Sequence, residues 1–270
     1  PGGGNNMRQG DQAGRPWPWI IFFLPLALAL TMVGIKLHDP FAYHAMIQED
    51  GPLENTQFCC YAAAGLLSLW AALRFRASGL AWHAGAALLL GLGFLLVAGD
   101  EISWGERILG YHLPQFFARY NVQREVSLHN LRPVQYCLHT MYMLAGLILS
   151  LGWLVKDKLL ARPGLSPLLR SLADCFVPPR ALSLYFLPVF LIYSYFLWGD
   201  VLLAAVFGGE NFAIGRVIVW RDQEPAELLL SMGCLLWAGR LLWQAVHRDQ
   251  VFGLGPVVAV LGRGVEQPQQ

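Results

Sequence analysis

The sequence predicts an all-α membrane protein, a polytopic helix bundle of about six transmembrane helices with interfacial or re-entrant helices on its outer side. Composition is the first observation. Of 270 residues, 56% are hydrophobic and 14% are charged, and the mean hydropathy is +0.44. A soluble domain carries more charge than this. The second observation is a series of long apolar runs, and the third is the alternation of Lys and Arg between successive connections.

The apolar runs set the number of helices, because a helix needs about 20 apolar residues to cross the hydrocarbon core of a bilayer. They cover residues 17–35, 57–73, 80–99, 133–155, 182–207 and 226–246. The first run has no small-residue cleavage site near its end, so we expect a retained anchor rather than a signal peptide. We predict a single transmembrane domain over 17–250. It is preceded by a tag remnant and cytoplasmic N-terminus at 1–16 and followed by a cytoplasmic tail at 251–270.

Positively charged residues predict the orientation, since Lys and Arg near helix ends favour the cytoplasmic side. They gather in four segments that alternate along the chain: Arg8 and Arg15; Arg74 and Arg76; Lys156, Lys158, Arg162, Arg170 and Arg180; Arg240 and Arg248. We therefore expect both termini in the cytoplasm and the protein in a bacterial inner membrane. The other three connections then face outward. They mix aromatic, aliphatic and charged residues, which is typical of short helices in the headgroup zone or dipping back into the bundle.

Charge and cysteine content narrow the function classes. The net charge is +1 and there is no basic stripe, so nucleic acid is not an expected partner. The five cysteines form no C-x-x-C pair, and we interpret them as small hydrophobic residues rather than a zinc or disulfide framework. The expected partners are membrane lipid, a lipid-linked substrate or another membrane protein.

Acidic residues concentrate in the predicted outer connections, in four short strings. EDGPLE contains Asp50 and Glu54, DEISWGER contains Asp100, Glu101, Glu106 and Arg107, REVSLHN contains Glu125 and His129, and RDQEPAE contains Glu224 and Glu227. Ionisable residues at membrane depth are costly unless they are paired or functional. We therefore predict one outward-facing pocket that gathers these side chains. The alternative is that the acidic residues complement helix dipoles, that His129 faces water, and that the arginines pair with neighbouring carboxylates.

Carboxylates together with an imidazole suit a divalent cation, here zinc, manganese, iron or calcium. The predicted metal ligands are Glu54, Asp100, Glu125, His129 and Glu227. A bound metal with an open position would activate water, and a remaining carboxylate would act as general acid or base. The predicted catalytic residues are Glu101, Glu106 and Arg107.

The strings GDEISWGERILG and NVQREVSLHN resemble a pattern of uncharacterised bacterial multi-pass membrane proteins, E-I-S-W-G-x-R followed by N-V-Q-x-E-x-x-L-H-N. The resemblance covers most of residues 48 to 230 and implies no activity. This chain has Asp100 and Glu106 where the pattern has Glu and Gln. LENTQ and DEISW are more weakly similar to ceramidase-like membrane hydrolases, a zinc amidase family. The paired H-x-x-x-H of its last helix is missing here.

Three functions follow as hypotheses. The first is a divalent-metal-dependent hydrolase or transferase that acts on a lipid-linked or envelope substrate. The second is a non-enzymatic accessory or scaffold subunit of a membrane complex. The third is a transporter, which the clustering of charge at one surface and the lack of an inverted repeat disfavour.

Overall fold

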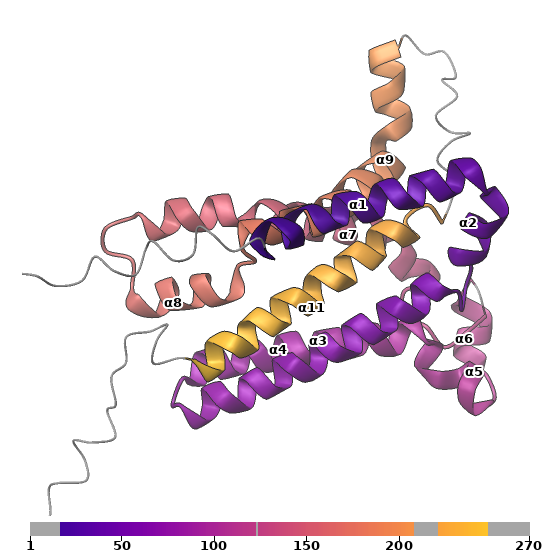
Figure 1. Cartoon of the computed structure of the whole chain (residues 1–270). Coiled ribbons are helices and arrows are strands. Elements are labelled where there is room, and N and C mark those ends of the chain that lie inside the picture. The colour runs from indigo at the N-terminus through magenta and orange to yellow at the C-terminus, as the bar shows by residue number, and fades with distance from the viewer. Residues whose placement is uncertain (1–16, 123, 208–220, 248–270) are drawn as a thin grey trace, which may run out of the picture. The chain divides into compact units, whose positions relative to one another are not determined.

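The computed structural model describes residues 17–122, 124–207 and 221–247 (Figure 1). In this part of the chain the regular structure is helical, apart from one isolated antiparallel bridge between Asn121 and Leu131. The predicted all-α class is confirmed. The tag remnant and N-terminus at 1–16 and the tail at 251–270 lie outside the described residues.

Six long helices account for the six apolar runs. They are α1 (Trp17–His38), α3 (Pro52–Ala77), α4 (Ala81–Glu101), α7 (Arg132–Leu160), α9 (Ser183–Phe207) and α11 (Glu224–Val246). The shortest, α4, has 21 residues. At a rise of about 1.5 Å per residue it is about 31 Å long, which matches the hydrocarbon core of a bilayer. Six candidate spans are found among the described residues, so the chain is a multi-pass integral membrane protein.

The helix surfaces support this conclusion. Large apolar side chains lie exposed along the long helices, among them Leu30, Leu37, Trp82 and Leu89, whose exposed fractions run from 63% to 76%. In water such a continuous apolar surface would be costly, whereas in a bilayer it faces lipid.

Short helices occupy the connections. Those predicted to face outward contain α2 (Pro40–Met46), the 3-10 turn η1 (Ser103–Gly105), α5 (Glu106–Leu109) and α6 (Gln115–Tyr120). The prediction of short helices is confirmed in the first two of these connections, whereas residues 208–220 of the third lie outside the described residues. The connection between α7 and α9 contains α8 (Pro167–Phe176) and the turn η2 (Arg180–Leu182). We did not predict α8, although Ser166 and Pro167 form a standard helix start, in which the Ser166 hydroxyl accepts from the backbone N–H of Leu169 at 3.2 Å.

By its contacts the chain divides into two compact units. The first comprises residues 1–54, 135–153 and 178–230, and the second comprises 55–134, 154–177 and 231–270. The division passes through α3, α7 and α11. The single transmembrane domain expected over 17–250 stays a prediction.

In the first unit, α1 packs against α2 and α9. A small core forms around Tyr43, Ile47 and Leu53. Helices α7 and α9 approach closely at Gly146, where an added Cβ would lie 2.5 Å from the backbone nitrogen of Phe190. Glycine allows this approach because it has no Cβ. Small residues are common where membrane helices pack closely, for the same reason.

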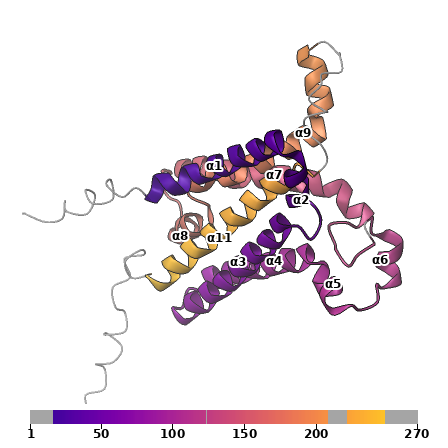
Figure 2. The ribbon, with the colours of Figure 1, turned by 45° about the vertical axis from the view of Figure 1, so that its right-hand side comes forward.

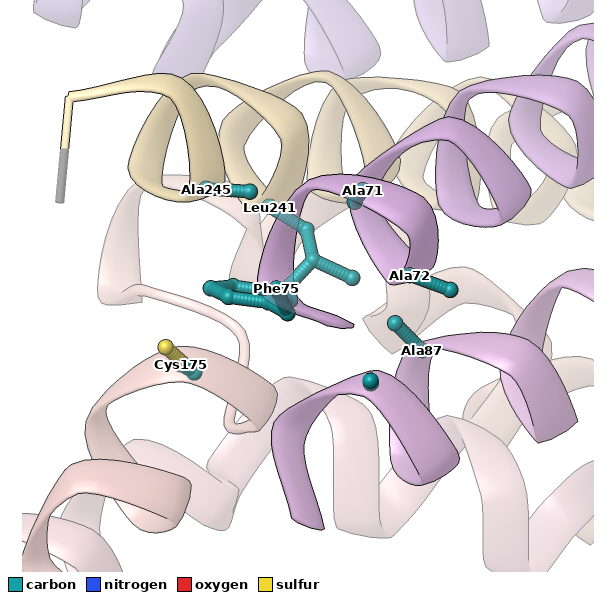
Figure 3. Packing of buried hydrophobic residues seen from close by; sticks show 8 residues of the cluster. Ala71, Ala72, Phe75, Ala87, Cys175, Leu241 and Ala245 are labelled. Carbon is teal, nitrogen blue, oxygen red and sulfur yellow. The ribbon is translucent and has the colours of Figure 1, made fainter. Parts of the chain in front are cut away.

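In the second unit, α3 and α4 lie side by side in both views (Figures 1 and 2). Their contact passes through Gly65 and Gly91, and a Cβ on Gly91 would lie 2.9 Å from a methyl carbon of Leu69. Further along, Phe75 is fully buried among alanines of both helices (Figure 3). The same cluster includes Cys175 of α8, so α8 belongs to the core of this unit.

Candidate functional site

The candidate site is a polar network between the end of α4 and residues 121–131, all within the second unit. Its geometry begins with a chain reversal. Directly after α4, Ser103, Trp104 and Gly105 have φ angles of 49°, 53° and 78°. Glycine adopts this left-handed conformation freely, whereas Ser103 and Trp104 are strained in it by about 1–3 kcal/mol each. Strained residues of this kind cluster at functional sites, because the surrounding structure has to hold them in place.

Trp104 is held against the last turn of α4. Its ring packs on Gly99, where an added Cβ would lie 2.9 Å from the ring. Its indole Nε1 lies 3.3 Å from Oδ1 of Asp100, to which it donates a long hydrogen bond. The reversal therefore turns the chain back over the carboxylate of Asp100.

Asp100 holds the segment 121–131 by accepting hydrogen bonds from the backbone of that segment. Oδ1 accepts from the N–H of Leu128 at 2.5 Å, and Oδ2 accepts from the N–H of His129 at 2.9 Å. Oδ2 also lies 2.7 Å from Nδ1 of His129. A carboxylate with this many donors is stabilised in its ionised form. The residue is 8% exposed, so these bonds replace most of its hydration.

The hydrogen-bond partners of His129 define its tautomer. Asp100 can only accept, so Nδ1 of the imidazole carries the proton that joins them. On the other side, Nε2 lies 2.9 Å from the amide nitrogen of Asn130, which donates to it. This arrangement of partners is the one that suits a neutral imidazole oriented by a carboxylate. Its side chain is 33% exposed, so the ring is reachable from outside the network.

Glu125 is the second buried carboxylate, with 7% of its surface exposed. The hydroxyl of Ser103 donates to Oε2 at 2.7 Å. The hydroxyl of Ser127 and the amide of Asn130 donate to Oε1 at 2.8 Å and 2.7 Å. Three donors facing one carboxylate keep it ionised and explain why a charge is tolerated there. Asn130 therefore links the two carboxylate centres, with one N–H toward Glu125 and the other toward His129.

Two further residues close the loop. The side-chain amide of Asn121 donates to the backbone oxygen of Ser127 at 2.9 Å. The carboxylate of Glu106 in α5 accepts from the backbone N–H of Val126 at 2.7 Å. Residues 121–131 are thereby fastened to α4 and α5 mainly through backbone groups, so their shape depends on these few polar side chains.

The structure brings together four of the predicted site residues: Asp100, Glu106, Glu125 and His129. Glu101 lies at the end of α4 and is half-buried. Arg107 lies in α5, and its side chain is outside the described part of the structure.

The other predicted residues belong to the first unit. Glu54 accepts from the backbone N–H of Asp50 at the start of α3, and Glu227 accepts from the hydroxyl of Tyr193. Glu224 lies in the first turn of α11, as the helix-dipole alternative expects. A single pocket that joins all these side chains stays a prediction.

Five members of the network were not among the predicted site residues: Ser103, Trp104, Asn121, Ser127 and Asn130. Asn121 opens the string NVQREVSLHN, and its place there was the available signal. Trp104 stands in the string DEISWGER, but its contact with Asp100 depends on the left-handed turn, which the sequence did not predict.

The network can support proton transfer. A neutral imidazole hydrogen-bonded to a carboxylate is a standard general base, since the carboxylate orients the ring and stabilises it when it takes up a proton. Among the described residues, no three His, Cys, Asp or Glu side chains are grouped so as to hold a metal ion. Most lone pairs of Asp100 and Glu125 already face donors, so a metal ion here would have to displace hydrogen bonds. No family model, curated protein or solved structure matches this chain.

Proposed function

We propose that the protein is a membrane-bound hydrolase or transferase in which His129 transfers protons at the membrane surface. The observation that carries the proposal is the Asp100–His129 pair, 2.7 Å between Oδ2 and Nδ1, with the ring one-third exposed. The pair follows directly on the end of a spanning helix, which suits a lipid-linked or envelope substrate whose reactive group lies at headgroup level.

The proposed chemistry uses one water or hydroxyl group as nucleophile. Asn130 turns away from Nε2, and Nε2 takes the proton of the nucleophile as it attacks a carbonyl or phosphoryl group of the substrate. The bond to the leaving group breaks, and the imidazolium returns the proton to that group. The buried charge of Asp100 stabilises the imidazolium. Glu125 keeps its hydrogen bonds from Ser103 and Ser127 during the step, and these hold the chain in place.

The divalent cation expected from the sequence is proposed as an alternative to this proton transfer, because a cation bound to Nε2 of His129 would leave that nitrogen unable to act as the base. Nε2 of His129 is the nitrogen that would ligate it, and Asp100 on the opposite nitrogen is the usual orienting partner of a metal-bound imidazole. Such a cation would polarise the substrate and activate water.

The test compares membranes from cells that produce the wild type, His129→Gln or His112→Gln. His112 is an exposed histidine of the same connection and serves as the matched control. Untargeted mass spectrometry of lipids and envelope precursors is expected to show species that change with the wild type and His112→Gln but not with His129→Gln. If every species behaves alike in the three strains at equal protein levels, the enzymatic proposal is wrong.

The second candidate is a non-enzymatic accessory subunit. The observation that favours it is that the polar groups of the network hydrogen-bond to one another. Such a network would hold residues 121–131 in one fixed shape, to which a partner protein could bind. In that case a membrane-protein partner co-purifies with the wild type, and Glu125→Ala reduces the amount of partner without changing any lipid species.

A further inference from the structure

The first unit contains a cavity of about 410 Å³ that the polar network does not use. Its walls come from α1, α9 and the start of α11, and they are apolar over most of their area, with Met32, Leu191 and Leu229 among them. The volume falls within the range of about 300–1,000 Å³ that is usual for small-molecule sites. A cavity of this kind accommodates a hydrocarbon chain.

One end of the cavity is polar. Nζ of Lys36 lies 2.5 Å from Oδ2 of Asp222, and the hydroxyl of Tyr43 donates to Oδ1 of Asp222 at 2.9 Å. Burial, and then the bond to Asp222, raise the pKa of the Tyr43 hydroxyl, which therefore stays a neutral donor. Asp222 has 7% of its side chain exposed and Lys36 has 26%. The charged groups among the described lining residues are thus one positive and one negative group, side by side at the polar end.

The polar end lies where spanning helices end. Lys36 is in the last turn of α1, Tyr43 is in α2 directly after it, and Asp222 stands just before α11. The lining of the cavity also includes Ala29 of the same helix. Ala29 is seven residues earlier in α1, about 10 Å deeper along the helix axis. The cavity therefore runs from the interface toward the membrane interior, in the direction of a bilayer lipid.

We propose that this cavity binds a bilayer phospholipid with a zwitterionic headgroup, such as phosphatidylethanolamine. One acyl chain lies along the apolar walls. The headgroup phosphate accepts from Lys36, and the headgroup ammonium donates to Asp222. Charge complementarity selects this class, because an anionic headgroup with no ammonium would satisfy Lys36 but leave its charge beside Asp222.

The test uses the full-length protein in vesicles made of equal amounts of phosphatidylethanolamine and phosphatidylglycerol. The protein is extracted with mild detergent and washed, and the retained lipid is quantified by mass spectrometry. We expect the wild type to retain phosphatidylethanolamine in excess over phosphatidylglycerol. Equal retention of the two lipids, or a wild type that retains neither and forms a dimer instead, overturns the proposal.

A matched pair of variants tests the location. Ala29→Trp fills the cavity, whereas Ala27→Trp adds the same side chain at an exposed position of the same helix. Ala29→Trp should lower retained phosphatidylethanolamine by about tenfold, and Ala27→Trp should leave it unchanged. Equal retention in the two variants overturns the location.

Asp222→Asn tests the headgroup. It removes the carboxylate charge beside Lys36 and should shift the preference toward phosphatidylglycerol by about tenfold. The asparagine oxygen can still accept from Tyr43, so the fold is expected to persist, and thermal unfolding checks this. A preference that does not change in the folded variant overturns the assignment of the ammonium to Asp222.

Discussion

Asp100→Asn gives the sharpest test of the polar network. Asp100 accepts from three closely placed N–H donors, at 2.5, 2.9 and 2.7 Å. Asparagine keeps one acceptor oxygen and brings an NH₂ group against at least one of these donors. If His129 changes tautomer to relieve that contact, its new Nε2–H faces the NH₂ of Asn130. One donor-to-donor contact thus remains for either orientation of the new amide and either tautomer of His129.

The magnitude follows from these contacts. One buried donor without an acceptor costs about 1–3 kcal/mol, and loss of the charge from the remaining bonds costs roughly 1 kcal/mol more. A total of about 2–4 kcal/mol raises the open population of residues 121–131 by roughly 30- to 700-fold. Hydrogen exchange of the peptide that contains Leu128 and His129 measures this population.

The control is Asp157→Asn, which makes the same chemical change at an exposed position of α7. It should leave the exchange of that peptide unchanged. Exchange that is also unchanged in Asp100→Asn would refute the reasoning, because residues 121–131 would then be held by something other than the carboxylate of Asp100.

Three further predictions concern the metal, the orientation and the packing. If His129 ligates a divalent cation, the detergent-purified wild type contains stoichiometric metal and His129→Ala does not. A wild type without metal would show that the metal prediction is wrong. With the native cysteines replaced, Arg119→Cys should react with an impermeant maleimide in intact cells, and Arg76→Cys only after lysis; the reverse pattern inverts the orientation. Gly146→Ala should lower the free energy of unfolding by about 1–3 kcal/mol, because its Cβ would lie 2.5 Å from the Phe190 backbone. Gly93→Ala should leave the free energy of unfolding unchanged, because nothing lies within 4 Å of the added Cβ. Equal melting temperatures of the two variants would disprove the close contact at Gly146.

The sequence was sufficient for the six long helices, because spanning length and hydropathy are local properties of the chain. It was less informative for α8. The positive charges of that connection predict its side of the membrane but no helix. The only local sign of a helix start is Ser166 followed by Pro167. Tertiary burial of Cys175 then holds α8 in place, and this contact has no local signature.

For the candidate site, the sequence identified the strings but could not sort their members. Asp100 and Glu101 are neighbours at the end of a helix, where successive side chains point about 100° apart. Which of them meets His129 depends on the direction in which the chain leaves α4. That direction is set by a left-handed turn at Ser103 and Trp104, residues for which such a turn is uncommon. Local propensity therefore favoured no particular partner for His129.

The amide of Asn130 makes the hydrogen-bond chain directional. Both of its N–H groups are committed, one to Glu125 and one to His129. A second proton on the imidazole would need an acceptor where the amide now offers a donor, so the amide would have to rotate and present its oxygen to Glu125 as well. Acidification that charges His129 would thereby take the Asn130 donor away from Glu125, the carboxylate that also holds Ser103. Uptake of one proton by the exposed imidazole would then weaken the turn at the end of α4.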